Sequence, residues 1–509
     1  MKPLYHMNFR SLIFSTALLA GIPLLFSSCM VGPDYVKPSD PTPASYKEMG
    51  DWKQAHPKDD AIRGKWWEIY HDQQLNTLEN QVNISNQNVL QAEAQFRAAA
   101  ALVKVTRAGL FPTLTANPAY TESQASQNLT ARSSSSSSGG HTGAVAQGLY
   151  NLPLEASYMV DIWGAVRRNV EANSASAQAS FADLENARLS YQATLAQDYF
   201  SLRGLDAEKQ LLDTTVASYE KFLTLTTNRY NGGIASKADV AQAKTQLETA
   251  KAQLIDLGVQ RAIFEHAIAT LIGKPASIFS LNETPLTATP PLVPVAVPSV
   301  LLERRPDIAG AERRIASANA SIGVQVAAYY PSITLNGSLG QESIQLSQLF
   351  SGPSFFWSVG PVLAQTLFNG GKTHGQVQEA QANYEATVAA YRQTVLTAFQ
   401  QVEDNLSGQR ILENEAAVED EAVKSAQQSL DIATNQYKAG TQDYLQVITA
   451  QTIALNNEVT AVNLRTRRMT TSVLLIEALG GGWDVSKLPS SHGVADVPEA
   501  QSQIVKAKK

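Results

Sequence analysis

Apolar residues recur at alternating spacings of four and three over one very long stretch of this chain. The stretch runs from Gly164 to Tyr230, contains no proline and has one internal glycine, Gly204. A 3.5-residue period keeps one seam of a helix against a neighbouring helix. The seam consists of Tyr191, Leu195, Leu202, Leu205, Leu212, Val216, Tyr219, Leu223 and Tyr230. At 1.5 Å per residue such a helix spans about 100 Å, far more than the helices of ordinary globular domains.

A second stretch, from Gly371 to Tyr437, also lacks proline and predicts a second long helix. The other faces of both stretches are crowded with Ala, Ser, Gln and Asn. Small side chains permit close approach of helices and make a poor solvated face. We therefore predict a wall of helices, each packed on both sides, rather than a solitary two-stranded coiled coil.

Each long stretch ends in a turn with the pattern Tyr-x-x-Gly, at residues 230–233 and 437–440. Glycine adopts the left-handed conformation of a helix C-terminus at little cost. Residues suited to N-caps follow each turn, and new helical stretches lead to Gly273 and Gly480. The capping candidates are Ser236, Asp239, Thr441 and Asp443. Each long helix is therefore expected to fold back as an antiparallel helical hairpin.

Ahead of each long helix the period changes from 3.5 to 2, which is typical of strands with one apolar and one polar face. The alternating segments are 113–121, 150–162, 333–339 and 355–363. The segment 150–162 is long enough to cross a bilayer at a tilt. Trp163 and Phe368 lie where strand gives way to helix, as the interfacial aromatic girdle of a membrane barrel requires. The pattern favours four membrane strands over an ordinary sandwich edge.

These patterns recur with a period of 207 residues, which indicates internal structural repetition. Residues at the turns coincide, although identity elsewhere is low. The matching pairs include Gly164/Gly371, Tyr230/Tyr437, Gly233/Gly440 and Gly273/Gly480. We predict a pseudo-symmetric protomer of two units, each a β-hairpin followed by a helical hairpin.

The N-terminus has the features of a bacterial secretion signal with a lipid-attachment site. Basic residues precede a short apolar stretch at 12–26. Residues 26–29, Phe-Ser-Ser-Cys, resemble a lipobox and make Cys29, the single cysteine of the chain, the predicted site of acylation. Lipoproteins with Asp directly after the acylated cysteine tend to stay at the inner membrane. Met30 occupies this position here, which favours location of the protein at the outer membrane. The alternative is an ordinary signal peptide with an incidental cysteine. Residues 30–60 are rich in Pro and polar residues and predict an extended arm.

Composition argues against several classes of function. The 509 residues carry a net charge of -6, so the chain lacks the basic footprint of a nucleic-acid-binding protein. The seven histidines are scattered without metal-ligand spacing, and the sequence contains no nucleophile motif or phosphate loop. We therefore expect neither an enzyme nor a cofactor or metal site. Six consecutive serines at 133–138 indicate a surface loop between strands.

Four strands cannot close a membrane barrel on their own. Within lipid every backbone donor and acceptor must be paired internally, so an open sheet is not viable. Bacterial single-chain barrels start at eight strands, and an eight-stranded barrel is roughly filled by its own side chains. Two copies would give eight strands and three would give twelve. Because a conduit needs the wider barrel, the sequence predicts a homotrimer.

Four groups of residues match motifs of a known family of membrane proteins. They are Cys29-Met30-Val31-Gly32-Pro33-Asp34-Tyr35, Trp66-Trp67 with Leu75, Leu301-Leu302-Glu303-Arg304-Arg305-Pro306-Asp307-Ile308 with Ala311-Glu312, and the two Tyr-x-x-Gly turns. The chain thereby resembles the outer-membrane factor family, the TolC- and OprM-like channels, and most closely its lipoprotein branch in RND-type tripartite efflux systems. The match spans nearly the whole mature chain. Pro306 also suits the first turn of a helix, where its missing N–H costs nothing.

The resemblance implies a trimer with a twelve-stranded barrel in the outer membrane and a long α-helical tunnel through the periplasm. It implies a periplasmic adaptor protein and an inner-membrane RND-type transporter as partners, and drugs or toxic compounds as cargo. It places the periplasmic aperture and the adaptor contact at the hairpin tips. The corresponding residues are Tyr230, Gly232, Gly233, Asp239, Tyr437, Gly440 and Asp443.

The acidic gate of TolC-like members is only partly reproduced. Gln446 and Thr449 stand where those members place aspartates, which leaves the selectivity of the aperture for cations open. Asp239 and Asp443 are equally compatible with plain helix caps.

The expected fold class is mostly α-helical with a β-barrel part. The expected divisions are a signal peptide (1–28), a lipidated arm (29–65), a first repeat (66–273, with a β-hairpin at 113–162 and a helical hairpin at 164–273), a Pro-rich crossover (274–306), a second repeat (307–480, with hairpins at 332–368 and 371–480) and a C-terminal tail (481–509).

Two other functions are open at this level. One is an outer-membrane duct for type I protein secretion, although the lipobox and the 301–308 motif favour efflux. The other is a coiled-coil structural lipoprotein of the cell surface, which would not need alternating strands ahead of each coil.

Overall fold

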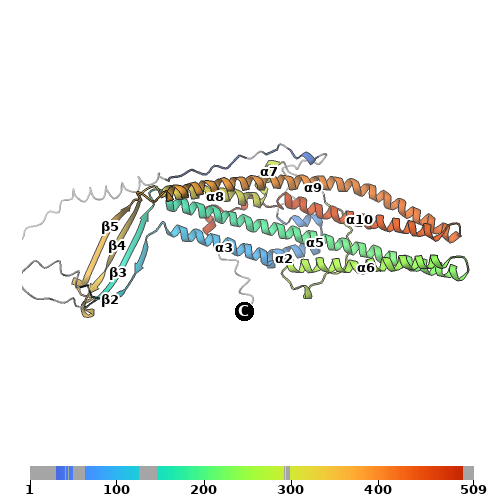
Figure 1. Cartoon of the computed structure of the whole chain (residues 1–509), viewed down its shortest axis with the longest axis horizontal. Coiled ribbons are helices and arrows are strands. Elements are labelled where there is room, and N and C mark those ends of the chain that lie inside the picture. The colour runs from blue at the N-terminus through green and yellow to red at the C-terminus, as the bar shows by residue number, and fades with distance from the viewer. Residues whose placement is uncertain are drawn as a thin grey trace, which may run out of the picture.

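The molecule is elongated, with an antiparallel sheet at one end and long helices that extend away from the sheet (Figure 1). The computed structural model describes residues 30–39, 42–43, 45–49, 64–124, 126, 146–291, 293 and 298–496. Cys29 and the predicted signal peptide lie outside these residues, as does the serine run. The predicted fold class, mostly helical with an antiparallel sheet, is confirmed.

Two helices extend from the sheet to the far end of the molecule (Figure 1). They are α5 (Ala165–Asn231) and α9 (Lys372–Ala439), with 67 and 68 residues. Each is followed by a shorter antiparallel helix, α6 (Lys237–Leu271) after α5 and α10 (Tyr444–Ala478) after α9. Because α10 begins and ends 207 residues after α6, the two hairpins keep the period found in the sequence.

Each shorter helix is continued towards the sheet by a further helix that meets it end to end. α3 (Gln87–Ala108) starts where α6 stops, and Asn86 Nδ2 donates a 2.8 Å hydrogen bond to the main-chain oxygen of Leu271 there. α8 (Pro306–Ala327) starts where α10 stops, with proline in its first turn as predicted. At that junction Arg305 Nη1 donates a 2.9 Å hydrogen bond to the main-chain oxygen of Ala478. The α6–α3 pair packs on α5, and the α10–α8 pair packs on both α5 and α9.

The close packing of α5 explains its internal glycine. A Cβ on Gly204 would lie 2.1 Å from Oγ1 of Thr466 on α10, so any side chain there would push the two helices apart. α5 has helical neighbours on both sides, as predicted. Leu195 and Leu202 of the predicted seam are fully buried. Tyr230, the last seam residue, is 43% exposed, so the seam prediction is wrong at the tip, where α5 gives way to a turn.

The strands form a single antiparallel sheet. They are β1 (Thr113–Ala116), β2 (Ala119–Ser123), β3 (Gln147–Val160), β4 (Ser332–Ser343) and β5 (Phe355–Ala364). β1 and β2 pair with β3 in one continuous register, so they form one ribbon interrupted at Pro118, which has no N–H for the ladder. The sheet is thus four ribbons wide, with β3 beside β4 in the middle. Among the described residues, β1, β2 and β5 each pair on one side only.

The register aligns apolar side chains on one face of the sheet and polar side chains on the other. One apolar row across the four ribbons is Ala116, Leu154, Leu339 and Trp357. The neighbouring polar row is Thr115, Glu155, Ser338 and Ser358. The large side chains of the apolar row are exposed in the single chain. This arrangement is the two-faced ribbon that the alternation predicts.

The N-terminal arm lies along the helices. The backbone N–H of Val31 donates to the main-chain oxygen of Trp163, 3.1 Å away, at the root of the sheet. Farther along, the carboxylate of Glu403 on α9 accepts hydrogen bonds from the backbone N–H groups of Lys47 and Glu48, at 2.7 and 2.9 Å. The arm therefore connects the sheet junction with the middle of α9.

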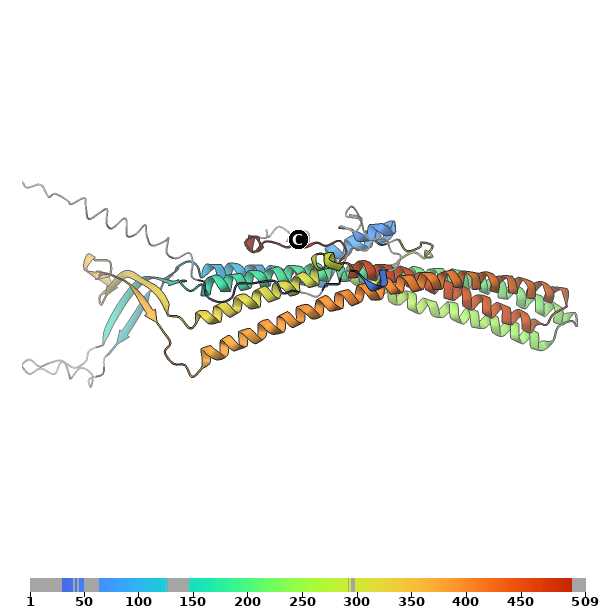
Figure 2. The ribbon, with the colours of Figure 1, turned by 90° about the horizontal axis from the view of Figure 1, so that it is seen from above.

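The main hydrophobic core lies near mid-length, where short elements cover the long helices (Figure 2). The short elements there include α2 (Gln73–Ser85), α7 (Pro298–Arg304) and the 3-10 turns η1 (Lys47–Met49), η3 (Trp66–Tyr70) and η4 (Ala276–Ile278). The other 3-10 turns are η5 (Leu346–Gln348) and η6 (Gly352–Ser354), which lie between β4 and β5 of the sheet, and η7 (Val485–Lys487) and η8 (Gly493–Asp496), which follow α10. Tyr70 of η3 packs on Phe200 of α5, with ring centroids 4.9 Å apart. Such aromatic pairs dominate core energetics.

Candidate functional site

The candidate site lies at the tips of the two helical hairpins, at the opposite end of the molecule from the sheet (Figure 1). Each turn holds a glycine in the left-handed conformation, Gly233 with φ 78° and Gly440 with φ 75°. Residues with a Cβ seldom adopt this conformation, so both turns depend on glycine. Gly232 has φ -81°, outside the left-handed region, so the backbone at this position does not require glycine.

One arginine joins the two tips. Nη1 of Arg229, in the last turn of α5, donates a 2.7 Å hydrogen bond to the main-chain oxygen of Tyr437, in the last turn of α9. The guanidinium carbon also lies 4.6 Å from the centre of the Tyr437 ring. A cation is favourable at the carbonyl end of a helix, and a cation–π contact adds about 0.5–1 kcal/mol at an exposed position. The two hairpins of one chain are therefore tied together at their ends.

Tyr437 belongs to a small buried cluster behind the turns. Its ring lies 5.3 Å from that of Tyr444, the first residue of α10, and both side chains are buried. Its hydroxyl donates to Oγ1 of Thr226 on α5, 3.3 Å away. Burial, with smaller contributions from neighbouring tyrosines and Asp239, raises the pKa of Tyr444 above its ordinary value. The cluster fixes the ends of α5, α9 and α10 to one another.

The two predicted aspartates have different surroundings. Asp239 forms a capping box with Ser236: its carboxylate accepts a 2.9 Å hydrogen bond from the Ser236 backbone, and its own N–H donates to the Ser236 hydroxyl at 3.1 Å. Asp443 occupies the N-cap position of α10, but its side chain makes no capping hydrogen bond and is exposed. Asp443 is therefore the more available carboxylate of the two.

The internal repeat breaks at this site. Tyr230 is the counterpart of Tyr437 but is exposed, and the counterpart of Arg229 is Gln436. Sequence analysis selected Tyr230 and missed Arg229. The signal that could have identified Arg229 is this difference between otherwise matching turns.

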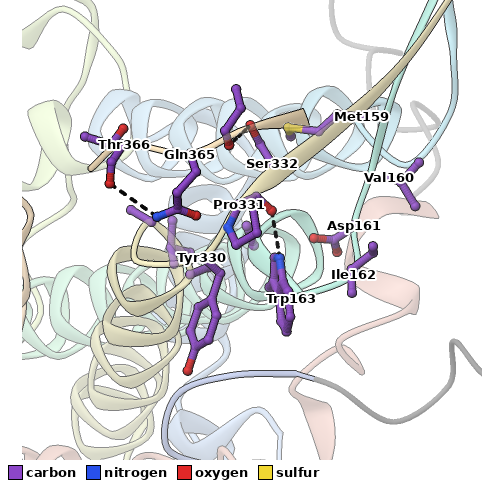
Figure 3. Close-up of a pocket in the computed structure, with 15 residues that line it drawn as sticks. Met159, Val160, Asp161, Ile162, Trp163, Tyr330, Pro331, Ser332, Gln365 and Thr366 are labelled. Carbon is purple, nitrogen blue, oxygen red and sulfur yellow. Dashed lines mark hydrogen bonds between the residues drawn. The ribbon is translucent and has the colours of Figure 1, made fainter. Parts of the chain in front are cut away.

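A second notable feature lies where the sheet meets the helices. Trp163 stacks on Tyr330 with ring centroids 4.6 Å apart, and its Nε1 donates a 2.8 Å hydrogen bond to the main-chain oxygen of Pro331 (Figure 3). Gln365 and Thr366 line the same cavity of about 390 Å³. Aromatic rings that bury an apolar body and satisfy one polar atom are typical of membrane–water interfaces.

The predicted lipidation site, Cys29, is outside the described residues, but the next residue is placed. A Cβ on Gly164 would lie 2.3 Å from Cγ of Met30, so Met30 packs directly on the start of α5. The described part of the arm therefore begins at the junction between sheet and helices, at the level of Trp163.

A buried charge cluster on α5 and α6 binds the chain itself. The carboxylate of Asp206 accepts hydrogen bonds from Arg203 at 2.9 Å, from Arg261 at 2.8 Å and from the backbone N–H of Thr284 at 2.9 Å. Its oxygens are thus used to hold the crossover segment.

Across the described ranges, His, Cys, Asp and Glu side chains form no group of three that could hold a metal ion. No helix in the described part is long and apolar enough to cross a membrane.

Comparison with known proteins identifies the family. A family model described as "Outer membrane efflux protein" matches residues 78–274 and 297–481, which is well over half of the chain. The chain belongs to this family.

The relatives of the chain match it over almost their whole length. Outer membrane protein OprJ of Pseudomonas aeruginosa is 30% identical over 465 residues, which cover 91% of this chain and 95% of OprJ. The toluene efflux pump outer membrane protein TtgC of Pseudomonas putida is 29% identical over 477 residues, with coverage of 91% and 95%. The solved structure of the outer-membrane channel OprN is similar with a TM-score of 0.81 at 28% identity, covering 89% of this chain and 100% of that one.

The predicted family, function and outer-membrane location are confirmed by these matches. The chain is the outer-membrane channel of an efflux pump and acts as a transport duct. The aperture residues and the lipid on Cys29 stay predictions.

Proposed function

We propose that three copies of the chain form a passive exit duct for small toxic compounds, from the periplasm through the outer membrane. The observation that carries this proposal is the sheet, which has one continuous apolar face and, among the described residues, two edges that pair on one side only. Lipid offers no hydrogen-bond partner to such edges, so other copies must supply one. Three copies give twelve ribbons and a conduit, whereas two give eight, a barrel that side chains fill.

The helices favour the same assembly. α5 lies between the α6–α3 pair and the α10–α8 pair, and α9 contacts the latter pair. In a ring of copies, α9 would lie beside the α6–α3 pair of the next copy, and the alternation of long and paired helices would continue. Exposed apolar residues on both outer helices support this contact. They are Ile255, Val259 and Ile263 on α6 and Ile411 and Val418 on α9.

Acylation of Cys29 would add a second attachment to the membrane. Met30 packs at the level of Trp163 and Tyr330, where an interfacial aromatic girdle would meet the membrane surface. A single lipid chain holds a protein only marginally, whereas two signals anchor it stably. The lipid and the barrel would therefore act together to fix the depth of the channel.

The hairpin tips would form the periplasmic aperture and bind a periplasmic adaptor protein, through which an inner-membrane RND-type transporter delivers the cargo. The proposed aperture residues are Tyr230, Gly232, Gly233, Asp239, Tyr437, Gly440 and Asp443. This assignment is supported by the position of the two hairpin turns, which lie at the end of the long helices farthest from the sheet. The named cargo of TtgC, toluene, makes apolar solvents a first class of compound to test. The two repeats, 66–273 and 307–480, would each build half of a protomer's share of the ring.

Complementation tests the proposal. The chain, expressed with its own adaptor and transporter in cells that lack outer-membrane efflux channels, should lower the accumulation of a fluorescent toxic compound. Its mass in detergent should equal three chains, and the adaptor should co-purify after cross-linking. A folded single chain that is soluble without detergent would contradict the assembly. Export of a large protein without any change in small-molecule accumulation would favour secretion instead.

A further inference from the structure

A polar cavity lies at the junction between α10 and α8. Its volume is about 300 Å³, and it is lined by residues of four helices of one chain, α5, α8, α9 and α10. Each of these helices packs against two of the others, so the cavity needs no second copy to be complete. Sites for small molecules have volumes of about 300–1,000 Å³. The cavity therefore has room for a small ligand.

Two of the three charged side chains in the lining neutralise each other. The guanidinium of Arg305 donates to both carboxylate oxygens of Asp307, at 3.0 and 2.6 Å. Its Nη1 donates to Gln401 Oε1 at 2.9 Å and to the main-chain oxygen of Ala478 at 2.9 Å. The arginine is thus fully engaged with the chain, and the third charged side chain, Glu477, sets the net charge of the cavity.

The carboxylate of Glu477 has no cationic partner. Among the described residues it forms no ion pair, and Arg305 is paired with Asp307 instead. Burial raises the pKa of Glu477, an effect that Ser190 and Arg305 oppose and Asp307 reinforces. Glu477 also lies in the last turn of α10, which holds no basic residue, and a negative side chain is unfavourable at that end of a helix. A cation in the cavity would offset each of these costs.

The first repeat builds the equivalent junction without an acid. The counterpart of Glu477 at 207 residues' distance is Thr270, whose hydroxyl donates to the main-chain oxygen of His266 in its own helix. Asn86 joins the helix ends there, as Arg305 does in the second repeat. Since α6 and α3 meet end to end with no carboxylate at that place, the junction itself does not require Glu477.

The rest of the lining suits an ammonium group that carries a short apolar chain. Asn186, Ser190 and Asn405 have side-chain oxygens that can accept from the three N–H donors of an ammonium. Leu189 and Leu474 add apolar surface to the same cavity. A metal ion is a poorer fit, because the part of the chain that the structure describes has no group of three His, Cys, Asp or Glu side chains to hold one.

We infer that this cavity binds a small primary ammonium compound, with Glu477 as the charged acceptor and Asn186, Ser190 and Asn405 as neutral acceptors. The site lies within one chain and does not depend on the proposed oligomer. Its acceptors come from α5, α9 and α10. A bound ammonium would therefore tie these three helices together beside the α10–α8 junction.

Binding of butylammonium to the purified full chain in detergent tests the inference, with ligand-observed NMR titration as the readout. Glu477→Gln keeps the size of the side chain and removes its charge. Because hydrogen bonds to charged groups are the stronger ones, we expect the affinity of this variant to fall about tenfold or more. Asp431→Asn, at an exposed carboxylate of α9, is the matched control and should bind as the wild type does.

A second variant tests the cavity independently of the charge. Leu474→Trp places a larger side chain in the lining and keeps the carboxylate, so it should also abolish binding. Butanol has the same chain length without the charge and should bind much more weakly than butylammonium. Sodium chloride at the concentration of the ligand should not displace it. The detergent mass and circular dichroism of each variant verify that it is folded.

The outcomes decide the site and its ligand class separately. Loss of binding in Glu477→Gln and Leu474→Trp, with binding kept in Asp431→Asn, supports the inference. Wild-type affinity in Glu477→Gln overturns the role of the carboxylate, and wild-type affinity in Leu474→Trp places the ligand outside the cavity. Equal binding of butanol, or displacement by sodium, overturns the ammonium class. If Glu477→Gln does not fold, Leu474→Trp and butanol decide the question.

Discussion

Nη1 of Arg229 lies 2.7 Å from the main-chain oxygen of Tyr437, and this contact links the first helical hairpin to the second at their tips. The counterpart of Arg229 in the second repeat is Gln436, which lacks the charge. A repeat-related contact between neighbouring copies would therefore be weaker than the contact within a chain.

Replacing the linking arginine should loosen the tips. Arg229→Ala removes a hydrogen bond from a charged donor, worth about 1.5–3 kcal/mol, together with its contact on the Tyr437 ring. We expect a larger ion conductance of the reconstituted channel in planar bilayers. Gln436→Ala is the matched control and should change conductance little. Equal increases from the two variants would show that the Arg229 contact does not restrain the tips.

Charge on the apolar face of the sheet should block membrane insertion. Leu154→Lys places an ammonium on that face, which costs about 2–4 kcal/mol at the middle of a bilayer. Glu155→Lys changes the adjacent residue on the polar face and serves as the control. We expect the yield of oligomer in outer-membrane fractions to fall for Leu154→Lys only. Normal yield of that variant would mean that the face does not meet lipid.

The junction between α10 and α8 depends on one buried arginine. Arg305 binds the carboxylate of Asp307 and the main-chain oxygen of Ala478. Arg305→Ala leaves both without this partner, and breaking a buried pair costs about 3–5 kcal/mol. Arg314→Ala breaks an exposed pair with Asp183, worth about 0–1 kcal/mol. The midpoint of thermal unfolding should fall clearly for Arg305→Ala alone, and similar shifts in both variants would refute the role of the junction.

One aspartate on α5 should make stability depend on pH. Burial raises the pKa of Asp198 to about 6, above the value of about 3.9 in an unfolded chain. Ionisation is therefore harder in the folded chain, and its cost is absent below about pH 4, grows up to about pH 6 and is complete above that. Asp198→Asn should raise the thermal midpoint at pH 7.5 and leave it unchanged at pH 4. Asp213→Asn, at an exposed position of the same helix, is the control. A gain of equal size at both pH values would contradict this account.

The lipid prediction is tested by labelling. Cells grown with radioactive palmitate should label the wild-type chain but not Cys29→Ala, because this is the single cysteine of the sequence. Oligomers should still form in the variant, in lower amount, since the sheet provides the other attachment. Label in Cys29→Ala would disprove the lipobox assignment.

The sequence pattern predicted the elements well where geometry is local. The alternation through Leu152, Leu154 and Ala156 corresponds to β3, and the left-handed glycines at 233 and 440 lie where the turns were expected. Periodicity reports which face of an element is buried, and the seam residues Leu195, Leu202, Leu212 and Tyr219 of α5 are buried as it predicts.

Contacts between distant segments were beyond this reasoning. Thr226 is a polar residue between Leu223 and Tyr230 of the predicted seam, yet it is fully buried because the hydroxyl of Tyr437 reaches it from the other hairpin. Arg229 looked like an ordinary residue of a last helical turn, and its partner is 208 positions away. The contact between the Arg229 side chain and the Tyr437 main-chain oxygen depends on how the two helical hairpins are rotated relative to each other. The spacing of apolar residues along one helix carries no information about that rotation.

The end-to-end meeting of α6 with α3, and of α10 with α8, has a mechanical consequence. A continuous helix that bends sharply must disrupt its own backbone hydrogen bonds, whereas two helix ends joined by side chains such as Asn86 and Arg305 can pivot by exchanging a few contacts. The two long helices, α5 and α9, are thus continuous, whereas the α6–α3 and α10–α8 pairs each contain a junction between two helix ends. Torsion applied at the tips would therefore first change contacts at these two junctions of the chain.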